Sequence, residues 1–389
     1  MPFAASVILA ASAAAAAAAT GPALPANPLD GRLVYESKHC HDCHGVAGGE
    51  RAIAPHLAGE HFSGSFLDLG AALWNHVPGM SVRLEANHRE WPELTEKETA
   101  NLIAFLFFID YLGEPGDPVA GEGIFTAKGC ATCHSVGGGE ADAGPDLGDL
   151  TRFPSPLFIA QATWNHGPAM FATMRQHGMS PPTFEEGDLA DLSAFIRRKA
   201  PGAPQLRVLL APGDPNRGRE LFAGKGCAVC HGSDARGAEG PDLSAVGLHR
   251  SAGGIAGTMW NHALAMSSTM RQRGIGWPSF TTPELADVVA FLYFLPFADR
   301  GGDAARGSRV YVDQGCASCH ADPDAAHAGP ELKSSGAAIS PEALVTKMWN
   351  HAPLMKKAVL AEGRPWPELT GEDLRHLYTY LAQQAPANP

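Results

Sequence analysis

The stretch Cys40-His41-Asp42-Cys43-His44 decides the fold of this 389-residue chain, because its pattern returns three more times along the sequence. The further copies are Cys130-Ala131-Thr132-Cys133-His134, Cys227-Ala228-Val229-Cys230-His231 and Cys316-Ala317-Ser318-Cys319-His320. Together the four pentapeptides use all eight cysteines of the protein. No cysteine is therefore left for a structural disulfide, a separate thiolate metal cage or a nucleophile.

The spacing Cys-x-x-Cys-His is the attachment signature of c-type haem, since two thiols hold one porphyrin edge and the next imidazole binds iron. A single copy could also be a redox motif or half of a zinc site. Zinc ribbons, however, pair their motifs about 15 to 20 residues apart, whereas these copies start 90, 97 and 89 residues apart. We therefore expect four covalently attached haem c groups, with the iron bound on its proximal side by His44, His134, His231 and His320.

The duplication extends well beyond the pentapeptide. A glycine stands nine residues before the first cysteine of each copy, at Gly31, Gly121, Gly218 and Gly307. An aromatic residue stands five before it, at Tyr35, Phe125, Phe222 and Tyr311, and a proline follows at Pro55, Pro145, Pro241 and Pro330. Each copy closes with apolar residues at steps of three and four, which predicts an amphipathic helix. These helices carry an aromatic residue at Phe105, Phe195, Phe291 or Tyr380.

These features resemble the class I cytochrome c domains over nearly the whole chain from Gly31 onward. The resemblance implies an all-α fold of four tandem domains, at 27–113, 114–205, 206–299 and 300–389, each wrapped around one haem. It implies that the first and last helices of a domain cross where the glycine lets an aromatic ring approach. It also implies that the proline carbonyl accepts a hydrogen bond from the proximal imidazole, which gives Pro55, Pro145, Pro241 and Pro330 a supporting role.

The sequence departs from this family on the distal side of the iron. Family members supply a methionine from a Met-Pro loop before the last helix, but here only the second copy has a methionine in that loop, Met179. All four copies instead carry Trp-Asn-His with a methionine four residues later. The histidines are His76, His166, His262 and His351, and the methionines are Met80, Met170, Met266 and Met355. Residues four apart share one helix face, so both are expected to point inward.

We favour the four methionines as distal ligands over the four histidines. A methionine that only filled a core would exchange readily with Leu or Ile, yet it stands in every copy. The histidine could instead bind a haem propionate together with the neighbouring Trp and Asn. An open iron, a ligand from the loop such as Met179, and a helix that merely packs remain the alternatives.

Three smaller expectations concern local structure. Thr95 and Thr282 precede acidic residues and are predicted to cap the closing helices. Phe107-Phe108 and Tyr293-Phe294 could form a docking surface, but such pairs more often belong to a core between domains. If the chain has a hinge, we expect it in the longest linker, which includes residues 201–204.

Composition indicates the location and the partners. Residues 1–19 are alanine-rich and aliphatic, which is typical of a signal peptide with a small-residue cleavage site, although a charged start is missing and a flexible tail is the alternative. We therefore expect a periplasmic or extracellular protein, which agrees with the site of haem attachment in bacterial members of the family. The formal net charge of −12 argues against nucleic acid and favours redox partners with basic docking surfaces.

The motifs favour an electron carrier over an enzyme. No nucleotide-binding glycine loop, nucleophile elbow or paired-carboxylate motif is present, so haem is the only chemistry on offer and no small-molecule substrate is expected. We predict a tetrahaem cytochrome that relays single electrons between redox partners, with a membrane respiratory complex as one candidate donor. The alternatives are a haem peroxidase or reductase with one open iron, and a structural subunit of a filament or respiratory complex.

Overall fold

A computed structural model of the chain describes residues 27–46, 53–57, 62, 64–138, 143–149, 155–200, 212–245, 251–321, 329–332 and 340–384. Within these residues it contains fourteen α-helices, four short 3-10 helices and no strand, which confirms the expected all-α fold. None of the helices in this part of the chain is long and apolar enough to cross a membrane. The predicted signal peptide and the predicted hinge lie outside the described residues.

The helices form four successive repeats, one for each Cys-x-x-Cys-His motif. Repeat 1 consists of α1 (Asp30–Ser37), η1 (Cys40–Asp42), α2 (Phe66–Ala86), α3 (Glu96–Phe108) and η2 (Ile109–Leu112). Repeat 2 consists of α4 (Pro118–Ala127), η3 (Cys130–Thr132), η4 (Leu147–Asp149), α5 (Pro156–Gln176) and α6 (Asp188–Lys199). Repeat 3 consists of α7 (Pro215–Gly224), α8 (Ala228–His231), α9 (Ala252–Gln272) and α10 (Thr282–Tyr293). Repeat 4 consists of α11 (Ala304–Asp313), α12 (Ala317–His320), α13 (Pro341–Ala361) and α14 (Gly371–Gln384).

In every repeat the first helix packs against the last, as α1 with α3, α4 with α6, α7 with α10 and α11 with α14. The glycine makes this approach possible, because a Cβ atom at Gly31 would lie 1.9 Å from the carbonyl oxygen of Asn101. The corresponding distance is 2.1 Å at Gly121 and 2.0 Å at both Gly218 and Gly307. The paired aromatic rings have centroids 5.4–5.7 Å apart in all four repeats. The glycine and aromatic prediction is therefore confirmed.

One of the two predicted helix caps is correct. Thr95 caps α3 in a reciprocal capping box with Glu98. The prediction of Thr282 as a cap is wrong by one residue, because Thr281 caps α10 and forms the box with Glu284. A capping box requires the acidic residue three positions after the cap, and Thr282 therefore becomes the first residue of the helix.

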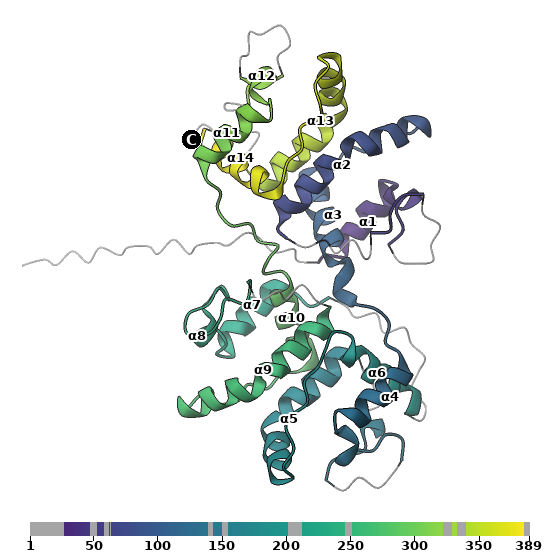
Figure 1. Cartoon of the computed structure of the whole chain (residues 1–389), viewed down its shortest axis with the longest axis vertical. Coiled ribbons are helices and arrows are strands. Elements are labelled where there is room, and N and C mark those ends of the chain that lie inside the picture. The colour runs from purple at the N-terminus through teal and green to yellow at the C-terminus, as the bar shows by residue number, and fades with distance from the viewer. Residues whose placement is uncertain are drawn as a thin grey trace, which may run out of the picture.

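The repeats do not assemble in chain order. Helix α2 of repeat 1 packs against α13 and α14 of repeat 4, and α5 of repeat 2 packs against α9 of repeat 3. Figure 1 shows the result as two lobes, with α1–α3 and α11–α14 in one and α4–α10 in the other. We call these the 1–4 lobe and the 2–3 lobe.

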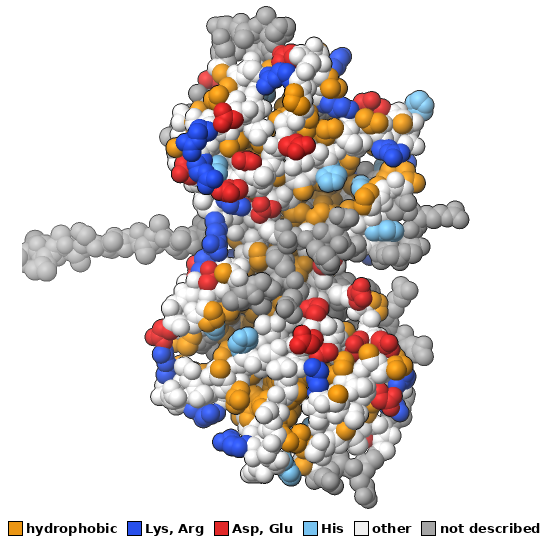
Figure 2. All heavy atoms as spheres, viewed as in Figure 1, with side chains coloured by type: hydrophobic (Ala, Val, Ile, Leu, Met, Phe, Trp, Pro, Cys, Tyr) orange, Lys and Arg blue, Asp and Glu red, His pale blue; other side chains and the backbone are white. Residues whose placement is uncertain are grey.

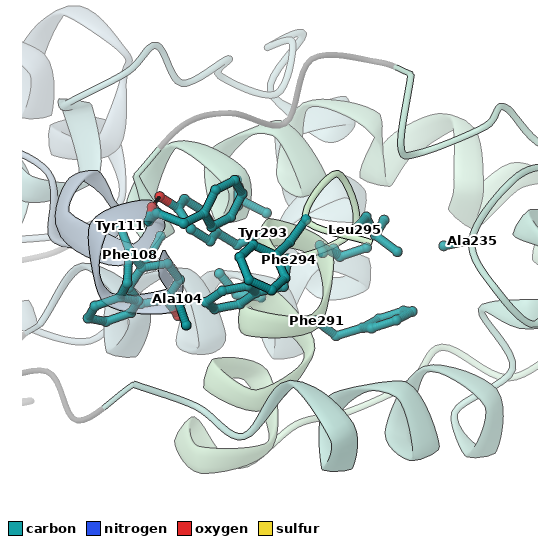
Figure 3. Packing of buried hydrophobic residues seen from close by; sticks show 14 of the residues in the cluster. Ala104, Phe108, Tyr111, Ala235, Phe291, Tyr293, Phe294 and Leu295 are labelled. Carbon is teal, nitrogen blue, oxygen red and sulfur yellow. Dashed lines mark hydrogen bonds between the residues drawn. The ribbon is translucent and has the colours of Figure 1, made fainter. Parts of the chain in front are cut away.

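An aromatic core joins the two lobes. Phe107 at the end of α3 meets Tyr293 and Phe294 at the end of α10, with ring centroids 5.1 and 5.3 Å apart. The Tyr293 hydroxyl donates a hydrogen bond of 2.5 Å to the carbonyl oxygen of Phe107. Figure 3 shows Phe108 and Tyr111 beside this group, and all of these rings are buried. The aromatic pairs thus form a core between repeats and not a docking surface.

Candidate haem sites

Each Cys-x-x-Cys-His motif forms a tight helical turn after the first helix of its repeat. The backbone N–H of the histidine donates to the carbonyl of the first cysteine at 2.9–3.0 Å in all four turns. None of the eight cysteines forms a disulfide, and all are half-buried. Burial raises the pKa of Cys40 and Cys227 to about 11 and also raises the pKa of Cys130 and Cys316. Before any covalent attachment, the first thiol of each pair is therefore neutral at pH 7, unlike an activated nucleophile.

The proximal histidines make the contact that the family resemblance implies. His44 Nδ1 lies 3.1 Å from the carbonyl oxygen of Pro55. The corresponding distances are 3.0 Å for His134 and Pro145, 3.3 Å for His231 and Pro241, and 3.0 Å for His320 and Pro330. Because a carbonyl can only accept, Nδ1 carries the proton in each ring. Nε2 then keeps the lone pair that an iron ligand needs.

A glycine before the proline makes room for the imidazole. A Cβ atom at Gly144 would lie 2.5 Å from His134 Cε1, and one at Gly329 would lie 2.3 Å from His320 Cε1. At Gly240 the nearest atom is His231 Nδ1, at 2.9 Å. Repeat 1 departs from this pattern, since Ala54 holds the position. The thiol pair, the oriented imidazole and this clearance together fit a covalently bound haem.

Near each of the first three motifs, a lysine that the sequence analysis did not predict binds the start of the closing helix. Lys38, Lys128 and Lys225 stand two residues before the first cysteine of their repeats. The Nζ atom of Lys38 donates to the carbonyl of Glu93 at 2.7 Å and pairs with Glu98 at 3.1 Å. Lys128 and Lys225 make the equivalent contacts to the start of α6 and α10. The signal was available, because the lysine recurs in three copies and is replaced only by Gln314 in the fourth.

The Trp and Asn side chains of the four long helices bind the backbone of a neighbouring repeat. In the 1–4 lobe, Trp74 Nε1 donates to the carbonyl of Pro367 at 2.8 Å. The Asn75 amide binds the backbone of Leu369 twice, at 2.8 and 3.0 Å. We call this set of contacts the Trp-Asn clasp.

The clasp is reciprocal within each lobe. Trp349 and Asn350 of repeat 4 bind the carbonyl of Pro92 and the backbone of Leu94 in repeat 1 at 2.7–2.9 Å. In the 2–3 lobe the same contacts join Trp164 and Asn165 to the loop of repeat 3, and Trp260 and Asn261 to the loop of repeat 2. Each long helix therefore holds the loop before the closing helix of its partner repeat.

The histidines and methionines of these helices differ in their surroundings. All four histidines are exposed, so the expectation that they point inward is wrong for them. Their Nδ1 atoms lie 2.8–3.0 Å from the carbonyl four residues earlier in the same helix. A residue two positions after the tryptophan lies about 200° around the helix, so docking of the tryptophan turns the histidine away from the partner.

The four methionines are half-buried and pack against the hydrophobic core. Met80 belongs to a small cluster with Cys40 and Tyr35, which also receives Trp349 from repeat 4. The loop candidate Met179 lies beside the attachment turn of repeat 2, with its Cε atom 2.9 Å from the Cβ position of Gly129, directly before Cys130. Met80 and Cys40 of repeat 1 thus pack against one hydrophobic cluster, to which repeat 4 contributes Trp349.

Comparison with known families agrees with these features. Residues 118–199 and 215–295 match the family model described as cytochrome c. Residues 302–381 match the family model described as cytochrome c oxidase, cbb3-type, subunit III. No curated protein and no solved structure matches the chain.

The helical fold, the attachment turns and these matches define a haem protein of the electron-transfer class. The chain is a c-type cytochrome, with haem c bound through its Cys-x-x-Cys-His motifs. Its partners are redox proteins.

Proposed function

We propose that this c-type cytochrome is a tetrahaem relay of single electrons, built from four cytochrome c domains at 27–113, 114–205, 206–299 and 300–389. The observation that carries the proposal is the imidazole-to-proline contact, which recurs with the same geometry after all four attachment turns. Bound haem would supply reversible one-electron chemistry. The chain would hold each group through two cysteines and one histidine and orient the histidine through the proline.

Haem content tests this proposal directly. A pyridine haemochrome assay on the purified protein is expected to return four haems per chain. Serine variants of one cysteine pair at a time should each remove one haem. A content of two or fewer in the wild-type protein would contradict four independent sites.

We propose Met80, Met170, Met266 and Met355 as the distal ligands. Their support is the half-buried position of all four side chains, against the exposed position of the four histidines. Methionine ligation gives oxidised haem a weak long-wavelength absorption band, which Met80→Leu should reduce by about a quarter while His76→Ala leaves it unchanged. The reverse result would assign the histidines. Rapid carbon monoxide binding by the reduced wild-type protein would instead indicate an open iron and favour the enzyme alternative.

The clasp suggests which repeats exchange electrons directly. Repeats 1 and 4 share one packed interface, as do repeats 2 and 3, and the aromatic core between α3 and α10 joins repeat 1 to repeat 3. Electron exchange within the 1–4 lobe would therefore link repeats at opposite ends of the chain. The proposed path is 4–1–3–2 and does not follow the order of the sequence.

A location outside the cytoplasm and a respiratory context complete the proposal. The first is supported by the signal-like residues 1–19, and the second by the match of residues 302–381 to an oxidase subunit family. Figure 2 shows acidic and basic side chains mixed over the visible face. The net charge of −12 supports partners with basic docking surfaces, so electron transfer to such a partner should slow as salt rises.

A further inference from the structure

The attachment turn of repeat 1 differs from the other three in the residues around its cysteines. The other turns begin with Gly129, Gly226 or Gly315 and carry Ala131, Ala228 or Ala317 after the first cysteine. Repeat 1 has His39 and His41 at these two positions, followed by Asp42. Haem attachment does not require this change, because three repeats build the turn without it.

The backbone conformation at His39 shows that a histidine in place of glycine has an energetic cost. Gly129, Gly226 and Gly315 have φ angles of 77–86°, in the left-handed region that favours glycine. His39 adopts the same conformation, with φ 63°. A non-glycine residue there costs about 1 kcal/mol, so repeat 1 carries an imidazole at a position where glycine would be more stable.

The three side chains converge on one point. His39 Nδ1 lies 3.4 Å from Asp42 Oδ2, and His41 Nε2 lies 3.1 Å from Asp42 Oδ1. One ligand atom from each residue falls within 4.8 Å of the others. Donors around a tetrahedral zinc ion are roughly 3.3 Å apart, given metal–ligand bonds of about 2.0–2.1 Å. The side chains of His39 and His41 are 66% and 45% exposed, so an ion can reach them from solvent.

We propose that His39, His41 and Asp42 form a binding site for a divalent transition metal ion beside the first haem-attachment turn. Two imidazoles and one carboxylate suit Zn²⁺, Ni²⁺ or Cu²⁺ and not the hard ions Mg²⁺ or Ca²⁺. Arg89 forms an ion pair with Asp42 and competes with the metal. The side chain of Arg89 is 43% exposed, and surface ion pairs of this kind contribute only about 0–1 kcal/mol, which a metal ion with three ligands would overcome.

Calorimetric titration of the chelator-treated, haem-loaded full chain with Zn²⁺ tests the site. The double variant His39→Gly/His41→Ala restores the residues of the other three repeats, so its turn is expected to fold. We expect the wild-type protein to bind one more Zn²⁺ per chain than this variant, with micromolar affinity that falls at least tenfold on substitution. His177→Ala, which removes an exposed histidine of repeat 2, should bind Zn²⁺ as the wild type does.

A second variant tests the role of the carboxylate. Arg89→Gln frees Asp42 from its competitor and should tighten Zn²⁺ binding severalfold. Unchanged or weaker binding in Arg89→Gln would overturn the three-ligand site. Equal stoichiometry and affinity in the wild type and the double variant would overturn the proposal as a whole. Haem content, measured in parallel, separates either result from a failure of the tetrahaem proposal.

Discussion

The two lobes use the same clasp but complete it differently. In the 1–4 lobe both long helices have a proline four residues after the clasp tryptophan, Pro78 and Pro353, and both partner loops carry a tryptophan, Trp366 and Trp91. In the 2–3 lobe only one side follows this pattern, with Pro168 in α5 and Trp277 in the partner loop. On the other side α9 has Leu264, and the partner loop has Pro181.

The hydrogen bonds explain why these residues change together. A proline has no N–H, so it leaves the carbonyl four residues earlier without its helical donor. Trp366 Nε1 lies 3.2 Å from the carbonyl of Trp74, and Trp91 Nε1 lies 3.0 Å from that of Trp349. Trp277 Nε1 lies 2.9 Å from the carbonyl of Trp164. Where Leu264 supplies the helical N–H, no loop tryptophan is needed.

Ring stacking follows the same division. The loop tryptophans lie 4.2–4.5 Å from the clasp tryptophans of their partners, measured between ring centroids. Trp260 has no loop tryptophan to stack on, and Phe171 of α5 lies 5.1 Å from it instead. The comparison teaches that the Trp-Asn hydrogen bonds are common to all four interfaces. The stacked loop tryptophan and the helix proline instead occur together or not at all. The loop of repeat 2 lacks the tryptophan, and among the four long helices only α9 of repeat 3 lacks the proline. The two therefore suit each other.

The largest effect is expected from Phe171→Ser, which places in repeat 2 the residue found as Ser81 and Ser267 in repeats 1 and 3. Phe171 is only 6% exposed, and loss of a buried aromatic ring costs about 3–5 kcal/mol. Urea unfolding should show this loss in the 2–3 lobe. Adding Pro181→Trp and Leu264→Pro, which copies the other lobe, should recover part of it; a loss that these changes deepen would contradict the matched pattern.

Trp91→Pro should have the next largest effect, about 2–4 kcal/mol, because it removes the stacked ring and leaves the carbonyl of Trp349 without a donor. Pro353→Leu supplies an N–H to that carbonyl and copies the α9 arrangement. A double-mutant cycle in chemical unfolding is expected to give a favourable coupling of about 1–2 kcal/mol between the two changes. Simple additivity would show that the proline and the tryptophan are unrelated.

Asn350→Ala should cost about 2 kcal/mol, because it leaves the N–H and carbonyl of Leu94 without their partner. The informative readout is hydrogen exchange, which should accelerate at Leu94 in repeat 1 although the substitution is in repeat 4. Asn87→Ala is the matched control, since its exposed amide bonds only within the end of α2. Faster exchange confined to repeat 4 would argue against the reciprocal clasp.

The smallest effect is the acid dependence that Asp146 contributes to the 2–3 lobe. Burial alone would raise the pKa of Asp146, but hydrogen bonds from the N–H groups of Gly138 and Gly137 outweigh it and hold the pKa at about 2. Since the unfolded value is about 3.9, this carboxylate stabilises the fold above pH 4 and loses that effect as the pH falls toward 2. The corresponding positions in the 1–4 lobe are His56 and Glu331.

Asp146→Asn tests this dependence. The melting temperature of the variant should lie below that of the wild type at pH 7, and the difference should shrink at pH 2.5. A difference that stays constant over this range would assign the loss to shape rather than to charge.

Much of each haem site could be predicted from local sequence. The attachment turn, the proline contact and the glycine crossing depend on residues at constant spacing within one repeat, so aligning the four copies was enough to find them. The exposed histidines and the role of Trp74 and Asn75 were not predicted, because their partners lie almost 300 residues away in repeat 4. The sequence shows where the helix proline and the loop tryptophan are present or absent. Their relation becomes clear only when the structure shows which helix packs against which loop.

The sequence by itself determined the all-α fold, the four attachment turns and the chemistry of the proximal side, because a thiol pair, an imidazole and a proline carbonyl act over a few residues. Only the tertiary structure decided that repeat 1 pairs with repeat 4 and repeat 2 with repeat 3. The physical reason is that the clasp binds backbone carbonyl and N–H groups, which nearly every residue possesses, so these hydrogen bonds do not reveal from sequence which repeat a helix will meet. The pentapeptide therefore identifies each repeat but does not indicate which other repeat packs against it.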